Sequence, residues 1–215
     1  MRQQLCALLI LLAAGHTLPV ALSSRDGSTT SAKHLMGFHI EQFGALNALG
    51  EISKKAHIVI GLDAIQPKEE STIAFDFVGG TVADLLNTFV SVSQDYAWSE
   101  TNSGVIHVQR SGAHVAILDV ALNYPGAVKK TRRDIWQDIA KRPEVIEWMR
   151  SNHCTRREFF TGGEFGSHND PISVEAGSLT VSGLLDEVAS KSGNNYWAVL
   201  QSPAKTPCTV HIILW

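Results

Sequence analysis

Of the 215 residues, 44% are hydrophobic, and 21 acidic against 18 basic residues give a formal net charge of −3. This balance argues against nucleic acid as a partner, because phosphate binding requires concentrated positive charge. The hydrophobic content favours a folded core over a disordered chain. We interpret the basic cluster at residues 129–133 as the solvated start of a helix.

The chain begins with the pattern of a secretory signal. Arg2 is followed by an apolar run over residues 5–14, and Ala21 and Ser23 are small residues that suit cleavage after Ser23. The run is shorter than the roughly 20 residues that span a bilayer. A buried N-terminal helix is the alternative, but the run has no polar face. We therefore expect residues 1–23 to be a cleavable signal peptide, with the mature protein periplasmic or secreted and without a membrane span.

Residues 24–35 are polar and small, which predicts a disordered leader, with folded structure from about Met36. A first unit is expected over residues 36–110. Ile73, Phe75 and Phe77 alternate with polar residues, and Thr81 precedes an apolar-striped helix. The expected elements are strands at 37–40, 57–62 and 72–77, helices at 45–56 and from Thr81, and a hairpin of 96–99 with 105–109.

Residues 115–215 partly repeat this unit. At an offset of 99 residues the matches are Ile73 with Ile172, Phe75 with Val174, Thr81-Val82 with Thr180-Val181, Leu85-Leu86 with Leu184-Leu185, and Trp98 with Trp197. After a five-residue insertion, residues 106–108 match residues 210–212. A capped helix between matching strands indicates an internal duplication. We therefore predict an α+β fold of two repeated units, each with helices packed on a short mixed β-sheet.

The region between the matching segments follows a less regular pattern. Residues 116–122 alternate like a strand, and residues 133–140 have the apolar spacing of a helix. Pro143 suits the first turn of a further short helix. A strand is expected at 157–160, followed by a loop over 161–170.

Residues 38–108, about a third of the chain, resemble the short N-terminal domain of secretins and TonB-dependent receptors. The matching motifs are the helix start at 45–49, the strand at 57–63 that ends in Asp63, the strand at 73–77, the helix start at 81–86 and the closing strand at 105–108. The C-terminal half is similar to a diverged second copy. The resemblance implies a fold and a contact role in the periplasm, whereas secretion and transport are not carried over.

Two cysteines remain after the expected signal cleavage, Cys154 and Cys208. In an oxidising compartment an even pair favours one disulfide. Two separate buried thiols are the alternative, since a free cysteine packs as a small hydrophobic residue. A metal site is the third interpretation, but only His153 lies beside Cys154, and no second cysteine or histidine lies at ligand spacing.

No other residues form a recognisable chemical motif. The sequence lacks a G-x-S-x-G elbow, a phosphate-binding loop, a dinucleotide fingerprint and an H-E-x-x-H pair, so we assign no catalytic, cofactor-binding or metal-binding residue. His107 and His211 are expected on the solvent side of their strands. Trp98 and Trp197 are expected to pack in the core.

Three functions remain open at this point. The leading hypothesis is an exported, non-catalytic module that binds another envelope protein or peptide, without a cofactor. The second is an envelope hydrolase or modifying enzyme with a site in the cleft between the repeats, built from loop residues: His114, His153, Glu164 and His168. The third is a structural envelope subunit that works through oligomerisation.

Overall fold

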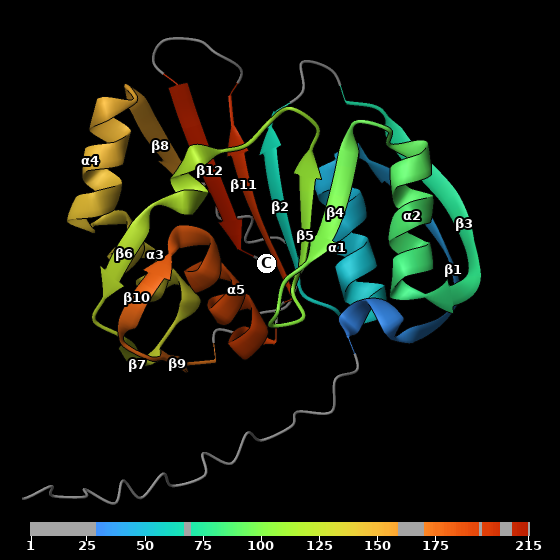
Figure 1. Cartoon of the computed structure of the whole chain (residues 1–215), viewed down its shortest axis with the longest axis horizontal. Helices are drawn as coiled ribbons and strands as arrows, with labels where there is room; N and C mark the ends of the chain where they lie inside the picture. Colours follow the sequence, from blue (N-terminus) through green and yellow to red (C-terminus); the bar gives the residue numbers. More distant parts are fainter. Residues whose placement is uncertain (1–28, 67–69, 159–169, 194, 203–207, 215) are drawn as a thin grey trace, which may run out of the picture.

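The computed structural model describes residues 29–66, 70–158, 170–193, 195–202 and 208–214, and it has an α+β fold (Figure 1). The first half contains η1 (Thr30–Ala32), β1 (His34–Phe43), α1 (Gly44–Ala56), β2 (Ile60–Ile65), β3 (Thr72–Thr81), α2 (Val82–Val92), β4 (Tyr96–Glu100) and β5 (Ile106–Arg110). The second half contains η2 (Ala116–Asp119), β6 (Ala121–Tyr124), β7 (Ala127–Lys130), α3 (Arg132–Ala140), α4 (Pro143–Ser151), β8 (Cys154–Glu158), β9 (Ile172–Val174), β10 (Gly177–Thr180), α5 (Val181–Ser192), β11 (Tyr196–Gln201) and β12 (Cys208–Leu214). The predicted signal peptide, residues 24–28 and the loop residues 161–169 lie outside the described residues.

A six-stranded mixed sheet joins the two halves, in the order β4-β5-β2-β11-β12-β8. In the first half β2 is parallel to β5, and β4 is antiparallel to β5. In the second half β8 is parallel to β12, and β11 is antiparallel to β12. By position and direction, β11 therefore corresponds to β4, β12 to β5 and β8 to β2. The parallel pair of β2 and β11 forms the seam between the halves.

The helices of the two halves cover opposite faces of this sheet. Because β11 runs parallel to β2, whereas β4 runs antiparallel to it, the second set of strands is turned over relative to the first. Alternate residues of β11 accordingly enter different cores: Tyr196 and Ala198 pack with α1 and α2, while Trp197 and Val199 pack with α3 and α5. Within the described residues, each half thus leaves one face of its own strands free of the helices of that half.

Each half also contains a smaller antiparallel ladder. In the first half β1 pairs with β3 from His34 opposite Thr81 to Phe43 opposite Thr72, and α1 and α2 lie between this ladder and the sheet (Figure 1). In the second half β6 pairs with β10 and β7 with β9. The helices that follow these ladders have similar caps: the hydroxyls of Thr81 and Thr180 each accept a hydrogen bond from a backbone N–H three residues later.

The ordered chain begins earlier than its composition predicts. Residues 30–32 form η1, and the backbone N–H groups of Thr30 and Ser31 donate to the carboxylate of Glu100 at 2.6 and 3.2 Å. β1 then starts at His34, so the predicted strand at 37–40 is only the middle of a longer strand. The carboxylate at the end of β4 thus helps to hold a segment that has almost no apolar residues, together with Lys33, whose Nζ donates to the backbone oxygen of Ala56 and whose C=O accepts from the N–H of Val82.

The predicted strand at 116–122 is wrong. Residues 116–119 form η2, in which Ile117 and Leu118 are both buried, and β6 begins only at Ala121. The alternation of apolar residues is misleading here because neighbouring side chains in this short turn can both reach the second core. The predicted strand at 157–160 is β8, which is described as far as Glu158; residues 159 and 160 lie outside the described residues.

Candidate functional site

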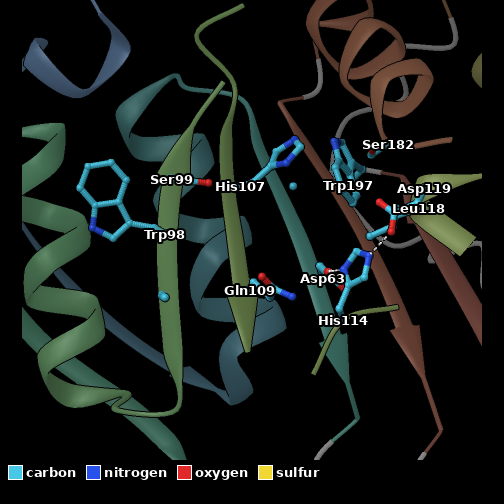
Figure 2. A pocket seen from close by; sticks show the side chains of 12 residues that line it. Asp63, Trp98, Ser99, His107, Gln109, His114, Leu118, Asp119, Ser182 and Trp197 are labelled. Carbon is cyan, nitrogen blue, oxygen red and sulfur yellow. Dashed lines mark hydrogen bonds and ion pairs between the residues drawn. The ribbon is translucent and has the colours of Figure 1, made fainter. Parts of the chain in front are cut away.

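A pocket of about 290 Å³ lies at the seam, on the sheet face that α1 and α2 leave open (Figure 2). Its floor consists of residues from β2, β4, β5 and β11, and its wall of residues from η2, α5 and the segment before η2. The pocket is therefore built by both halves, since the overturned second half places α5 and η2 beside the open strands of the first.

His107 of β5 and Asp186 of α5 bridge the seam at one side of this pocket. The Nε2 atom of His107 lies 2.9 Å from both carboxylate oxygens of Asp186. Asp186 also accepts a hydrogen bond of 2.8 Å from the indole Nε1–H of Trp197. Asp186 is only 9% exposed, and these contacts supply hydrogen-bond partners for its buried carboxylate. His107 thus lies on the open face of its strand, as the sequence predicts, but its side chain is only 29% exposed and contacts Asp186 instead of facing solvent freely.

His114 forms the other bridge, between two carboxylates. Its Nδ1 atom lies 2.5 Å from Asp63 of β2, and its Nε2 atom lies 2.6 Å from Asp119 of η2 (Figure 2). The second oxygen of Asp63 accepts the backbone N–H of Val115 at 2.9 Å. Desolvation lowers the pKa of His114, but the hydrogen bonds and charges of Asp119 and Asp63 outweigh it, so the pKa is raised above 6.5. Both ring nitrogens donate in the imidazolium, which fits a carboxylate on each side.

The polar groups of the pocket differ in what chemistry they can perform. His114 has both ring nitrogens engaged by carboxylates, so it serves as a bridge and not as a base. His107 contacts Asp186 through Nε2 alone, so its other ring nitrogen, Nδ1, takes no part in this contact. Ser99 of β4 is the direct strand partner of His107, and both side chains lie on the open face (Figure 2). Among the described residues there is no group of three or more histidine, cysteine, aspartate or glutamate side chains that could hold a metal ion.

Of the two described residues of the proposed inter-repeat enzyme site, the structure brings one to this pocket. His114 lines it, whereas His153 lies in the turn between α4 and β8, away from the pocket. Glu164 and His168 are outside the described residues. His211, the counterpart of His107, is partly buried on β12. Sequence reasoning missed Asp63, although a single acidic residue in an otherwise apolar strand was the available signal.

A disulfide joins Cys154 and Cys208, outside the pocket. The two residues are direct partners in the register of β8 and β12, and their Cα atoms are 4.4 Å apart, within the range that disulfides span. The bond fixes the end of the outermost strand, β8, to its neighbour.

The two tryptophans that match at an offset of 99 residues differ in environment. Trp197 is 1% exposed in the second core, and its indole covers Gly61 of β2 so closely that a Cβ atom there would overlap the ring. Trp98 is only partly buried against the first core, and its Nε1–H donates to Asn87 at 3.0 Å. Trp197 is paired with Gly61 of the neighbouring strand β2, whereas no described strand lies on the outer side of Trp98.

No model of a known protein family matches this chain, and no curated protein matches it. Among the described residues, no helix is long and apolar enough to cross a membrane.

Proposed function

We propose that this protein is an exported binding module that recruits another envelope protein or a peptide through an open edge of its six-stranded sheet. The observation that carries the proposal is the end of that sheet: within the described residues, β4 and β8 each have a paired strand on one side only. An edge strand offers a row of backbone donors and acceptors to an added strand, which supplies affinity without chemical machinery.

Two further features support this proposal. The correspondence of β4, β5 and β2 with β11, β12 and β8 fits a tandem of one unit, and the pattern of residues 38–108 resembles a periplasmic contact domain. A disulfide between Cys154 and Cys208 fits an oxidising compartment, and hence export. Neither feature requires a substrate or a cofactor.

Site-specific crosslinking in the cell envelope of the native host tests this function. A photo-crosslinking amino acid replaces Ala97 on β4 or Thr155 on β8. Val78 is the control, because it is 95% exposed and lies on the β1–β3 ladder, outside the six-stranded sheet. We expect a discrete adduct from position 97 or 155 and none from position 78. Equal labelling at all three positions, or no adduct at either edge, contradicts the proposal.

The second candidate function is a hydrolase that uses the seam pocket. The specific observation is the row of Ser99, His107 and Asp186, in which the carboxylate orients the imidazole and the hydroxyl lies opposite it. Hydrolysis of an activated ester by the purified protein, lost in Ser99→Ala and in His107→Ala while circular dichroism is unchanged, would support it. Hydrolysis no faster than in buffer would exclude it for esters.

A further inference from the structure

The edge strand β4 corresponds to β11. Among the described strands, β11 is paired on both sides, whereas β4 is paired with β5 alone. β11 has the same position and direction in its half, and β2 lies beside it from Ile60 opposite Tyr196 to Ile65 opposite Gln201. Under this cover the first four residues of β11 are at most 2% exposed. On β4, by contrast, Ala97 is exposed and Trp98 is only partly buried. The pairing of β2 with β11 therefore shows which kind of strand can pair with β4.

The backbone groups that β4 directs outward follow from its hydrogen-bonding register. The N–H of Ser111 donates to Asp95, and the N–H of Thr101 donates to Val105. Because hydrogen-bonded and non-bonded pairs alternate in an antiparallel ladder, residues 97 and 99 face β5 and residues 96, 98 and 100 face the open edge. The N–H of Tyr96 already donates to the backbone oxygen of Ser93. The outward donors are thus those of Trp98 and Glu100.

The seam also specifies the side chains of a strand that fits beside β4. Gly61 is the direct partner of Trp197, and the indole occupies the space of a Cβ atom there. Trp98 corresponds to Trp197, so the added strand needs a glycine opposite Trp98. The flanking positions face the other side of the sheet, where Leu62 lies beside the small Ala198. Ala97 and Ser99 are equally small and leave room for aliphatic side chains.

The edge at β8 is less suitable for an added strand. Its sequence contains Arg156, Arg157 and Glu158, and charged residues on an edge strand oppose pairing with another chain. The same residues argue against a second copy of this chain on β4.

We propose that β4 binds, in parallel, an extended segment of a partner protein with an aliphatic–glycine–aliphatic pattern, its glycine over Trp98. This inference rests on the proposed binding function and adds to it the edge, the direction and the class of ligand. Parallel pairing follows the direction of β2 against β11. The segment gains main-chain hydrogen bonds to Trp98 and Glu100, and the glycine allows the strand to approach past the indole.

The probe is a synthetic peptide with the sequence of residues 58–66, IVIGLDAIQ, carrying lysines at both ends for solubility. Titration into the whole isotope-labelled protein, followed by NMR, measures affinity and amide exchange together. We expect saturable binding, with slower exchange at the amides of Trp98 and Glu100 and little change at residues 97 and 99. A matched peptide with leucine in place of the glycine should bind about tenfold more weakly or not at all.

A matched pair of variants separates main-chain pairing from contact with the indole. Trp98→Ala removes the side chain and keeps the outward N–H, whereas Trp98→Pro removes both; proline is tolerated on an edge strand where its N–H would face solvent. We expect Trp98→Pro to bind at least about tenfold more weakly than Trp98→Ala. If the proline variant does not fold, the exchange pattern of the wild-type protein decides the question.

Three results would overturn this inference: equal affinity for the glycine and leucine peptides, exchange protection at β8 instead of β4, or no binding. A peptide-independent dimer joined at β4, detected by sedimentation and by protection of the same amides, would identify a second copy as the occupant and would also overturn it. Envelope crosslinks from position 97 or 155 in the absence of peptide binding would leave the proposed function standing and reject only this ligand class.

Discussion

The contact between Gly61 and Trp197 makes a sharp test of how the two halves are joined. Gly61 lies in the middle of the seam, and any Cβ atom there would overlap the six-membered ring of Trp197. The ring cannot move away freely, because it is 1% exposed and its N–H donates to Asp186 at 2.8 Å. Gly61→Ala therefore forces a choice between strain and a broken buried hydrogen bond.

The magnitude of this effect follows from opposing contributions. Overpacking a closely packed core costs about 1–3 kcal/mol, and losing a hydrogen bond to a charged group costs about 1.5–3 kcal/mol. Replacing glycine by alanine in a strand returns about 0.5–1 kcal/mol through the lower entropy of the unfolded chain. We therefore expect Gly61→Ala to lower the free energy of unfolding by about 1–2 kcal/mol.

Urea unfolding followed by circular dichroism measures this difference. Gly177→Ala is the matched control, since Gly177 begins β10 and a Cβ atom there meets nothing within 4 Å. We expect the control to be neutral or slightly stabilising. In a Trp197→Leu background, Gly61→Ala should lose most of its cost, which a double-mutant cycle detects. Equal stability of Gly61→Ala and Gly177→Ala, or strict additivity with Trp197→Leu, would refute the reasoning.

Three other predictions concern single interactions. Thr81→Ala should lower the unfolding free energy by about 1 kcal/mol, because it removes the hydroxyl that caps α2, and Thr81→Ser should lose much less; similar losses in urea titrations would contradict a capping role. The stabilisation from His114 should be complete below its ordinary pKa of 6.5 and disappear as the pH rises through its raised pKa in the folded state; His114→Gln should abolish this decline, and an unchanged pH profile of stability would sink the idea. The disulfide between Cys154 and Cys208, 54 residues apart, should contribute about 4 kcal/mol through the restricted unfolded chain, measured by denaturation with and without reductant; free thiols in the unreduced exported protein would show that it does not form.

Much of the secondary structure could be predicted from local pattern. The alternation around Phe75 and the cap at Thr81 identify a strand and the helix after it, because both signals come from residues a few positions apart. Sequence alone also placed Thr180 before a matching helix. The prediction failed at residues 116–122, where a short apolar run fits a strand or a turn equally well.

The site depended on the tertiary structure. His107 and His114 are ordinary histidines in sequence, and their partners become visible only when the second half is turned over and brings Asp186 and Asp119 beside them. The same holds for Gly61, whose lack of a side chain has a reason only once Trp197 lies over it. Such partners are far apart along the chain, so no local pattern records them.

The sequence by itself determined the two sets of helices and strands, since their hydrophobic periods and caps are local properties of the chain. Only the tertiary structure decided that β2 pairs with β11, that the helices cover opposite faces, and that no described strand pairs with the outer side of β4. The physical reason is that strand pairing relies on main-chain hydrogen bonds, which every sequence can offer. Which strands become neighbours is settled by the fit of distant side chains, such as an indole over a glycine.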